Sequence, residues 1–341
     1  MKAWLIHKTC DLNSESEPLM LADLPVPEPK SGELLLKIKT CGVCHTEIDE
    51  IEGRTPPAEY PVVPGHQVVG IIEQTNGIRK DLKEGDLVGV AWIFSACGEC
   101  EYCLSGQENL CNNFIASGRD ANGGYAEYMV VPENFVYKIP EIFTPSEAAP
   151  LLCAGAIGYR SVVLSQINNG DSLGLSGFGA SAHLVVKLVK YKYPESEIFV
   201  FARNGQEQKF ALELGCNWAG DTKDIPPRQL NAIIDTTPVW MPVIEALKHL
   251  KPGGRLVINA IRKEHADIDY LRNLDYPVHL WMEKEIKSVA NVTRKDVEEF
   301  IKLAAEMPFK PEIQEYSFAD ANKAIIDIKQ RRIKGAKVLM I

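Results

Sequence analysis

The chain has 341 residues and a formal net charge of −9, from 37 Lys and Arg against 46 Asp and Glu. This acidic balance argues against a general nucleic-acid-binding surface, because neutralising phosphates requires clustered Lys and Arg. A hydrophobic content of 45% and a length above that of one typical core predict a globular protein of two domains.

The N-terminal segment and the cysteine content indicate the cellular compartment in which the protein is expected. Met1–His7 has only a short apolar stretch, without the pattern of a secretory signal. No run approaches the roughly 18 apolar residues of a membrane span, so we expect no membrane association. Nine cysteines without a signal peptide point to a reducing compartment, where metal ligation is commoner than disulfides. The expectation is a cytoplasmic, metal-binding protein.

The N-terminal part of the chain, up to Pro150, reads as short strands separated by Gly and Pro turns. Strands are predicted at Glu33–Lys39, Val68–Gln74 and Leu87–Val90. Turn residues such as Pro64-Gly65 lie between them. This part is therefore expected to be mainly β.

A Cys-x2-Cys-x2-Cys-x7-Cys run follows these strands, formed by Cys97, Cys100, Cys103 and Cys111. Thiolates this close can enclose one tetrahedral Zn²⁺, which takes about four S or N ligands at roughly 2.3 Å per Zn–S bond. An all-thiolate site leaves no position for a substrate, so this zinc is predicted to be structural. Disulfides and scattered free thiols are the alternatives.

From about residue 154 strand-like and helix-like segments alternate, which is typical of βαβ units in a doubly wound parallel sheet. Strands are predicted at 172–176, 197–202, 231–235 and 255–260, and helices at 181–191, 206–214 and 240–250. A polar start at Thr293 leads into an amphipathic helix to Glu306, and 336–341 reads as a closing strand. The predicted fold class is α/β.

A glycine-rich loop joins the first strand of this region to its first helix. Glycines there let the backbone approach a dinucleotide pyrophosphate at a helix N-terminus. Ser176 stands where the strict G-x-G-x-x-G pattern has its second glycine, but the register Gly177-x-Gly179-x-x-Ala182 satisfies the G/A form. A structural turn is the alternative, and the strand–loop–helix order favours a cofactor site. The predicted cofactor residues are Gly174, Ser176, Gly177, Phe178, Gly179 and Ala180.

The end of the next strand predicts which dinucleotide binds. An NAD site places Asp or Glu roughly 20 residues further on, to bond the ribose 2′-OH, whereas an Arg accommodates a 2′-phosphate. Here the strand ends in Ala202-Arg203-Asn204, without a carboxylate. We therefore favour NADP(H) over NAD(H), with a solvated arginine on a loop as the alternative.

Three further segments carry residue types that bind metals: Cys44-His45-Thr46-Glu47, Pro64-Gly65-His66-Gln67, and Cys153 after Pro150-Leu151-Leu152. Each alone is more often a buried Cys or His than a ligand. Together with the four-cysteine run and the dinucleotide loop, they resemble the zinc-dependent medium-chain alcohol dehydrogenases over essentially the whole chain. The loop serine and the Phe-Ala-Arg-Asn strand end most resemble the bacterial cinnamyl-alcohol-dehydrogenase-like branch.

The resemblance implies an architecture and a reaction. It implies a GroES-like, mainly-β catalytic domain at 1–153 and 293–341, interrupted by a Rossmann domain at 154–292. It also implies a zinc-dependent alcohol dehydrogenase or aldehyde reductase that transfers hydride reversibly between a small alcohol or aldehyde and NADP(H). The family forms dimers and tetramers, so a homo-oligomer is expected.

The resemblance also implies roles for single residues. Cys44, His66 and Cys153 would bind a catalytic zinc with an open fourth position, which gives two Zn²⁺ per chain with the structural one. The remaining roles are a proton acceptor for bound alcohol at Thr46, a substrate-pocket wall at Trp92, and a pyrophosphate contact at His45.

Two positions depart from the family pattern. Gln67 follows the zinc-binding His66 where relatives usually have Glu, so we expect a more electrophilic metal. Asp49 stands where many relatives have the His that ends the proton relay. It can still accept a proton, but an ordinary carboxyl pKa near roughly 4 makes it a poorer base at neutral pH.

Two rival functions remain open. A polyol or secondary-alcohol dehydrogenase is the nearer rival, although such relatives often lack the four-cysteine run. The other is a non-catalytic module in which that run acts as a zinc ribbon contacting nucleic acid or protein. The acidic Glu99, Glu101 and Glu108 within the run speak against nucleic acid.

Overall fold

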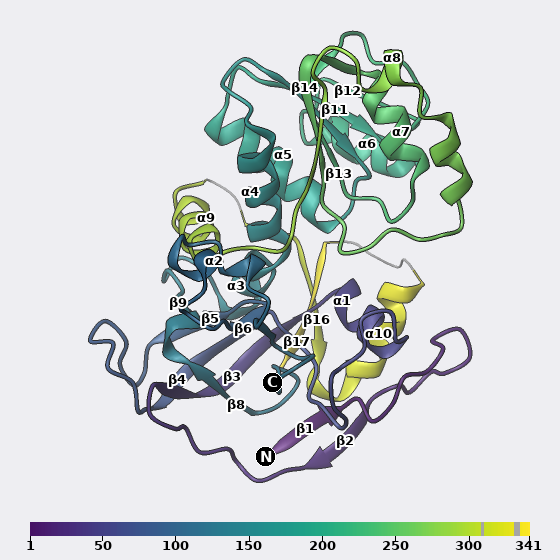
Figure 1. Cartoon of the computed structure of the whole chain (residues 1–341). Helices are drawn as coiled ribbons and strands as arrows, with labels where there is room; N and C mark the ends of the chain where they lie inside the picture. Colours follow the sequence, from purple (N-terminus) through teal and green to yellow (C-terminus); the bar gives the residue numbers. More distant parts are fainter. Residues whose placement is uncertain (308–309, 331–334) are drawn as a thin grey trace. The chain divides into compact units, whose positions relative to one another are not determined.

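The computed structural model describes residues 1–307, 310–330 and 335–341 (Figure 1). The described chain divides into two compact units. The first comprises Met1–Cys153 and Thr293–Ile341, and the second comprises Ala154–Val292.

The first unit is built on a seven-stranded sheet of the described residues, in the order β16-β17-β3-β4-β5-β9, with β8 also paired to β3. Its strands are β3 (Glu33–Val43), β4 (Val68–Thr75), β5 (Leu87–Val90), β8 (Tyr128–Pro132), β9 (Val136–Lys138), β16 (Ile313–Ser317) and β17 (Ala336–Met340). β16 and β17 are parallel, and the other pairs are antiparallel.

Strand β3 is the central element of this sheet. It pairs with β17, β4 and β8, and Cys41 lies opposite both Val68 and Leu339. Most of its side chains are buried, because ELLLKIKTCGV is apolar on both faces. The strand ends at Val43, directly before Cys44, and β4 begins two residues after His66. The sheet therefore brings these two segments to one edge.

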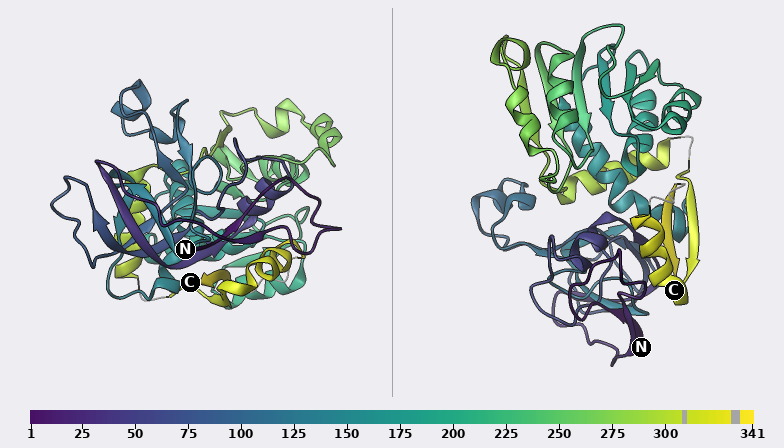
Figure 2. Two further views of the ribbon diagram at one scale, coloured as in Figure 1. Left: turned by 90° about the horizontal axis from the view of Figure 1, so that it is seen from below. Right: turned by 90° about the vertical axis from the view of Figure 1, so that its right-hand side faces the viewer.

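Smaller elements surround this sheet. They are the hairpin β1 (Lys2–Leu5) and β2 (Met20–Asp23), the helices α1 (His45–Ile51), α3 (Pro145–Ala148), α9 (Arg294–Glu306) and α10 (Ala321–Lys329), and the 3₁₀ turn η3 (Ala149–Leu152). The core beneath them includes Ile6, Leu36, Ile72, Tyr125 and Ile325. Figure 2 shows α10 lying along the two C-terminal strands.

The predicted four-cysteine run forms a lobe of its own, residues 93–116. It contains the short strands β6 (Ile93–Ser95) and β7 (Ile115–Ala116), which pair antiparallel, the single-turn helix α2 (Glu101–Leu104) and the turn η1 (Glu108–Leu110). Little regular hydrogen bonding holds so short a segment, so another interaction must fix its shape.

The second unit contains a six-stranded parallel sheet in the order β12-β11-β10-β13-β14-β15. The strands are β10 (Ser172–Ser176), β11 (Glu197–Phe201), β12 (Trp218–Gly220), β13 (Leu230–Asp235), β14 (Leu250–Ile258) and β15 (Glu285–Ser288). The helices are α4 (Ala154–Ser165), α5 (Ala180–Lys192), α6 (Gly205–Glu213), α7 (Met241–Lys248) and α8 (Tyr276–His279), with the 3₁₀ turn η4 (Ile268–Asn273). Helices cover both sides of this sheet (Figure 2).

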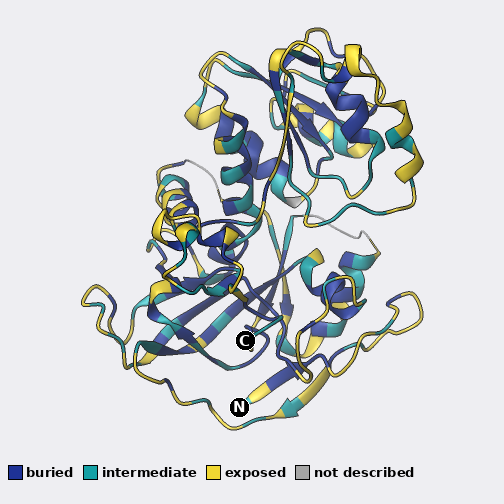
Figure 3. Ribbon diagram, viewed as in Figure 1, coloured by how far each residue is buried: buried dark blue, intermediate teal, exposed yellow. Residues whose placement is uncertain are grey.

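The strand order reverses between β10 and β13, which is the topological switch point where doubly wound sheets bind ligands. Strand β10 in the middle of the sheet is fully buried, whereas the edge strand β15 is exposed (Figure 3). The core includes Phe199, Ile233, Leu247 and Leu256. The predicted α/β class, a mainly-β part with a doubly wound parallel sheet, is confirmed.

Some predicted boundaries were wrong. The helix expected to reach Leu250 ends at Lys248, and β14 starts at Leu250 rather than Arg255. The strand passes through Gly253-Gly254, where Gly253 has φ +69°, and Leu230 already pairs with Leu250 before this bend. A glycine pair in a sequence indicates a turn, so the part of β14 before Arg255 was not predicted as strand.

One apolar stretch of the described chain, Pro145–Ser165, is long enough to cross a membrane by length and composition. It comprises α3, η3 and α4, and 67% of its most apolar window is buried inside the fold. Core helices of globular proteins pass the same test, so the stretch is weak evidence for a membrane span.

Candidate active site and metal centres

Cys44, His66 and Cys153 come together in the first unit, although they are far apart in sequence. Cys44 is the N-cap of α1, His66 precedes β4, and Cys153 follows η3. The Nε2 atom of His66 lies 3.6 Å from the Cys44 sulfur and 3.3 Å from the Cys153 sulfur. His66 is 1% exposed, whereas both cysteines are only half-buried. One side of the group is therefore accessible to a further ligand.

These separations fit a single tetrahedral zinc. With Zn–S at about 2.3 Å and Zn–N at about 2.0–2.1 Å, tetrahedral angles place sulfur and nitrogen about 3.6 Å apart. The Cys153 contact and burial raise the pKa of the Cys44 thiol well above its usual value. Two thiolates side by side therefore need a compensating cation, and the donor set matches a zinc with three protein ligands.

Glu47 supports this group from α1. Its Oε1 atom lies 2.7 Å from His66 Nδ1, and both side chains are almost fully buried. Its Oε2 atom accepts a hydrogen bond of 2.8 Å from the backbone N–H of Cys44. The carboxylate thus places a proton on Nδ1 and leaves Nε2 facing the two sulfurs. The sequence interpretation gave Glu47 no role, although its i+3 spacing from the N-cap is that of a capping box.

Two glycines allow the chain to pass close to His66. Gly65 has φ +100°, and a Cβ there would lie 2.4 Å from the Tyr125 ring. Gly118 has φ +83°, and its Cβ would lie 2.6 Å from the backbone nitrogen of Gly65. Any side chain at either position would displace the segment that carries the histidine.

Thr46, His45 and Asp49, the other residues predicted on α1, lie as follows. The backbone N–H of Thr46 donates to the Cys44 sulfur over 3.4 Å, which places Thr46 beside that ligand. His45 is the exposed first residue of α1. Asp49 is nearly buried, and its Oδ1 lies 2.5 Å from Arg54 Nε. This ion pair, which the sequence did not indicate, holds a carboxylate that was expected to accept protons.

Gln67 is 3% exposed and follows the histidine into the sheet. Its backbone oxygen accepts a 2.9 Å hydrogen bond from Gly42, and its side chain lies along that glycine. A Cβ on Gly42 would come within 2.7 Å of the Gln67 amide carbon. The side chain is therefore packed in a narrow space close to the ligands.

Trp92, the predicted pocket wall, lies between β5 and β6, half-buried. Its carbonyl accepts a 2.7 Å hydrogen bond from Ser117, and its ring packs on Phe114 with centroids 5.3 Å apart. The loop that carries Ser117 also carries Gly118, which touches the segment before His66. Trp92 is thus joined to the ligand segment through this loop.

The four cysteines of the lobe also converge. The sulfurs of Cys97 and Cys103 are 3.8 Å apart, and those of Cys97 and Cys111 are 3.5 Å apart. Two ligands of a tetrahedral zinc at about 2.3 Å are separated by about 3.8 Å, whereas a disulfide needs about 2.05 Å. Backbone N–H groups of Glu99 and Cys100 lower the pKa of Cys97 to about 6. The lobe therefore fits a closed all-thiolate zinc site.

Glu108 ties this lobe to helix α9. Its Oε1 atom accepts hydrogen bonds from the backbone N–H of Arg294, at 2.6 Å, and from Arg294 Nε, at 3.1 Å. Glu108 is 2% exposed, so its carboxylate serves this internal contact and does not contribute to the acidic surface of the lobe. Glu99 and Glu101 are exposed, as expected.

In the second unit, the predicted cofactor residues divide into two groups. Gly174 lies inside β10, where a Cβ would meet Ile233 at 2.8 Å, and Ser176 ends that strand 2% exposed. Phe178 is 6% exposed and packs edge-on against Phe210, so these three are packed into the unit. The loop itself is formed by Gly177, which has φ +82°, by Gly179, the N-cap of α5, and by Ala180, its first residue.

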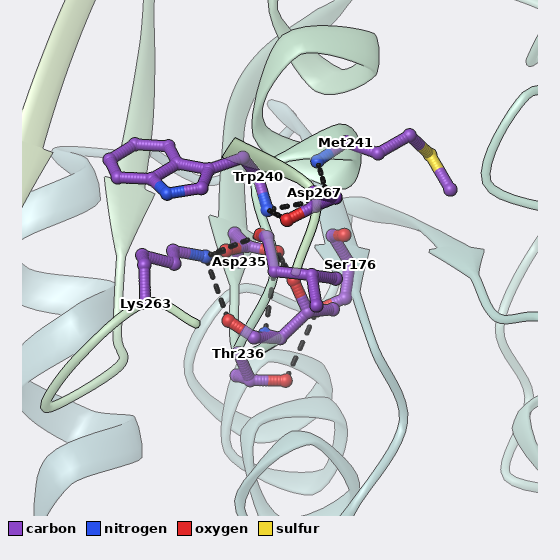
Figure 4. A network of polar contacts seen from close by, with 9 residues as sticks. Ser176, Asp235, Thr236, Trp240, Met241, Lys263 and Asp267 are labelled. Atoms are coloured by element: carbon purple, nitrogen blue, oxygen red, sulfur yellow. Dashed lines mark hydrogen bonds and ion pairs between the residues drawn. The ribbon is translucent and has the colours of Figure 1, made fainter. Parts of the chain in front are cut away.

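A polar network lies beneath this loop at the switch point (Figure 4). Thr236 donates its backbone N–H to the carbonyl of Ser176 over 2.9 Å. Asp235, fully buried at the end of β13, forms an ion pair with Lys263, which also donates to the carbonyls of Thr237 and Val239. Burial raises the pKa of Asp235, and Lys263 opposes that shift. The ammonium therefore holds the strand end and the loop after β14 together.

Strand β11 ends at Phe201, directly before the three residues predicted to contact the cofactor. Ala202 is buried and donates its N–H to Gly220, while Asn204 caps α6 by accepting from Gln206 N over 2.8 Å. Arg203 between them is exposed, and no described residue forms an ion pair or hydrogen bond with its side chain. A free guanidinium thus stands at the carboxyl end of a strand next to β10.

Comparison with known proteins gives three findings. Residues 30–141 match the alcohol dehydrogenase GroES-like domain. The chain is 39% identical over 346 residues to "Probable alcohol dehydrogenase AdhA" of Mycobacterium tuberculosis, covering 100% of this chain and 97% of that protein. Its fold is similar to a cinnamyl alcohol dehydrogenase of Helicobacter pylori complexed with NADP(H), with a TM-score of 0.84, 25% identity, and 99% and 97% of the two chains covered.

A third similar protein shows the fold alone. It is the acetophenone reductase of Geotrichum candidum in complex with NAD, with a TM-score of 0.83, 22% identity, and 100% and 97% of the two chains covered. Structures of this fold are thus seen with either dinucleotide.

Proposed function

Because the chain belongs to the zinc-type medium-chain alcohol dehydrogenase family, we propose that it oxidises primary alcohols to aldehydes, reversibly, with NADP(H) as the preferred hydride carrier. The protein is an oxidoreductase that acts on alcohols. The reaction converts an alcohol and NADP⁺ into an aldehyde, NADPH and one proton. The observation that carries the proposal is the Cys44–His66–Cys153 group with Glu47 behind the histidine.

The residues of the first unit have distinct parts in this proposal. When bound by Cys44, His66 and Cys153, a zinc ion would polarise the substrate oxygen as a Lewis acid. Thr46, whose backbone N–H contacts the Cys44 sulfur, is proposed to take the proton of the alcohol through its hydroxyl. Asp49, held by Arg54, is the next acceptor on α1.

The second unit supplies the dinucleotide site in this proposal. The loop Gly177–Gly179 and the N-terminus of α5 offer backbone N–H groups to the pyrophosphate. His45 of the first unit is proposed as a further pyrophosphate contact. Arg203 is proposed to bind the 2′-phosphate of NADP(H), because it has free N–H groups and no carboxylate beside it on the strand end.

The wider assignment follows the family. We assign catalysis to Met1–Cys153 with 293–341 and dinucleotide binding to Ala154–Val292. One zinc in each site gives two per chain, the one in the lobe being structural. A cytoplasmic homo-oligomer without membrane or nucleic-acid partners is part of the same proposal. A zinc-ribbon module would not require the Cys44–His66–Cys153 group, which disfavours that alternative. A preference for polyols is tested by the substrate series described below.

The cofactor assignment is tested by Arg203→Ala. Loss of a charge-assisted contact to the 2′-phosphate costs about 1.5–3 kcal/mol, so KM for NADPH should rise about tenfold or more. KM for NADH should stay within about twofold, because NADH lacks that phosphate. Initial rates of aldehyde reduction with each cofactor measure both. Equal changes for the two cofactors, or a wild-type preference for NADH, would contradict the assignment.

The reaction itself is tested by metal removal. Chelator-treated protein should lose aldehyde reduction with NADPH, and added Zn²⁺ should restore it. Cys153→Ser should behave like the chelated protein even with zinc present, because one of three ligands is replaced. Full activity of Cys153→Ser would sink the assignment of this site.

A further inference from the structure

A positively charged side chain lies among the aromatic rings beside the Cys44–His66–Cys153 group. The guanidinium carbon of Arg119 is 5.3 Å from the centroid of the Trp92 ring and 5.5 Å from that of Phe114. The Arg119 side chain is 22% exposed. The surface that Trp92 is proposed to offer the substrate therefore carries a cation as well as apolar rings.

The backbone places this cation close to the proposed metal ligands. Gly118, which precedes Arg119, packs against Gly65, which precedes His66. A Cβ on Gly118 would lie only 2.6 Å from the backbone nitrogen of Gly65. The Arg119 guanidinium and the His66 imidazole also both interact electrostatically with Glu50 of α1. Arg119 thus belongs to a loop that packs directly against the segment carrying His66.

Asp120 fixes the orientation of the guanidinium. Arg119 Nε donates to Asp120 Oδ1 over 2.8 Å, and Nη2 donates to Oδ2 over 2.6 Å. Asp120 Oδ2 is itself held by the backbone N–H of Ala116 at 2.9 Å. An arginine has five N–H donors, so three remain without an acceptor among the described residues. The rings and Asp120 together leave this donor edge pre-organised.

The charges around Arg119 select the kind of acceptor. Asp120 pairs with it directly, and Glu50 is 1% exposed with no described hydrogen-bond partner for either oxygen. Burial raises the pKa of Glu50, and the neighbouring Glu47 raises it further, so Asp120 is the carboxylate that balances the charge of Arg119. With that charge already balanced, a further carboxylate gains little here. A neutral oxygen can take the free N–H groups without adding negative charge.

We propose that Arg119 is a specificity-determining residue that selects substrates with a neutral hydroxyl or carbonyl oxygen close to the reacting carbon. This inference rests on the proposed function and names its substrate class, namely hydroxylated alcohols and the corresponding hydroxyaldehydes. A purely apolar substrate would cover the guanidinium and leave its donors unpaired, which sites built for hydrogen bonding penalise strongly. Cinnamyl and simple aliphatic alcohols are therefore poor substrates.

A matched series of primary alcohols tests this choice. The compounds share the frame HOCH₂–CH(X)–CH₃, with X as hydroxyl in propane-1,2-diol, methyl in 2-methylpropan-1-ol, and carboxylate in 3-hydroxy-2-methylpropanoate. The zinc-loaded full chain is assayed for NADP⁺ and NAD⁺ reduction with each. We expect kcat/KM for the hydroxyl compound to exceed the other two by about tenfold to a hundredfold, the worth of one hydrogen bond to a charged group.

Two variants of Arg119 and one control complete the test. Arg119→Met keeps the length of the side chain but removes charge and donors, so the diol preference should fall to about twofold or less while 2-methylpropan-1-ol improves. Arg119→Lys keeps the charge but loses the planar array of donors. Its diol preference should therefore lie between those of the wild type and Arg119→Met. Arg272→Met, at an arginine 85% exposed in an ion pair with Asp269, is the matched control and should keep the wild-type preference. Thermal midpoints check that every variant folds.

Each outcome decides something. Equal kcat/KM for the hydroxyl and methyl compounds in the wild type, or a diol preference that survives in Arg119→Met, overturns the role of Arg119 and leaves the alcohol dehydrogenase proposal standing. A preference for the carboxylate compound overturns the argument from charge. If neither the wild type nor Arg119→Met oxidises any of the three compounds or cinnamyl alcohol with either cofactor, both proposals fail.

Discussion

Glu47 fixes which nitrogen of His66 faces the two sulfurs, because its carboxylate occupies the space at Nδ1. The same carboxyl group bonds the N–H of Cys44 through its other oxygen. One side chain thus orients two of the three proposed ligands. Cys44, His66 and Cys153 were predicted only through their resemblance to a family pattern, and no role was predicted for Glu47. Its role depends on a contact across 19 residues of chain that local spacing does not encode.

Gln67 carries a prediction at the same scale. Gln67→Glu would put a carboxylate at a side chain that is 3% exposed, directly after the proposed ligand His66. Added negative charge opposes loss of the substrate proton, so the pH–rate profile of alcohol oxidation should move to higher pH. Rates from pH 6 to 10 measure this, with Gln206→Glu on the exposed start of α6 as the control. A profile that does not move would show that position 67 is electrostatically remote from the chemistry.

Helix α1 is the element that carries most of the proposed catalytic residues, and its end is clamped by Glu52. The Oε1 atom of Glu52 lies 2.5 Å from Lys329 Nζ at the end of α10 and accepts from Leu12 N over 3.3 Å. Burial raises the pKa of Glu52, but hydrogen bonds from Lys329 and Arg54 lower it by more, so its pKa lies below the ordinary value. The ionised side chain therefore stabilises the fold.

The pH dependence of this clamp follows from that direction. Because the folded-state pKa is below the unfolded one, the stabilisation is present above about pH 4.5 and is lost as the pH falls through the folded-state pKa. Glu52→Gln should cost about 1 kcal/mol at pH 7, and the difference from wild type should shrink below about pH 4.5. Urea unfolding at several pH values measures it. Glu213→Gln, in an exposed pair with Lys209, is the control, and a gap that stays constant to pH 3 would refute the clamp.

The four-cysteine lobe depends in the same way on one buried carboxylate. Glu108 bonds the first N–H of α9, where the positive end of the helix dipole also favours a negative charge. Glu108→Gln should loosen the lobe, so a chelator should extract its metal roughly tenfold faster, about the effect of 1.4 kcal/mol on a barrier. Glu101→Gln, an exposed residue of the same lobe, should leave the rate unchanged. Equal rates of metal extraction from the two variants would show that the hydrogen bonds between Glu108 and Arg294 do not stabilise the lobe.

At the scale of the whole molecule, the sequence predicted the features that depend on residues close together in the chain. Strands β5 and β10 lie at the predicted residues, because turn residues bound short apolar runs there. The Cys97–Cys111 spacing likewise indicated a site that the fold assembles. Strand β16 was missed because its short segment depends on pairing with β17. Helix α10 was missed although its buried residues, Ala321, Ala324, Ile325 and Ile328, follow a helical spacing.

Several features that escaped prediction join segments distant in the chain. Arg119 reads as a loop residue until its position over Trp92 and Phe114 is known. Lys263 reads as surface charge, yet it is buried against Asp235. Such contacts are set by how the sheets are assembled, and neither hydrophobic period nor motif spacing carries that information.

The zinc content of the purified protein tests the central claim most directly. We predict about two zinc atoms per chain in the wild type, and about one in Cys153→Ser and in Cys103→Ser, because each substitution empties one of two independent sites. Only Cys153→Ser should lose activity at once, since the lobe holds no substrate position. One zinc per chain in the wild type that survives Cys153→Ser and disappears in Cys103→Ser would contradict the claim, because the Cys44–His66–Cys153 group would then hold no metal.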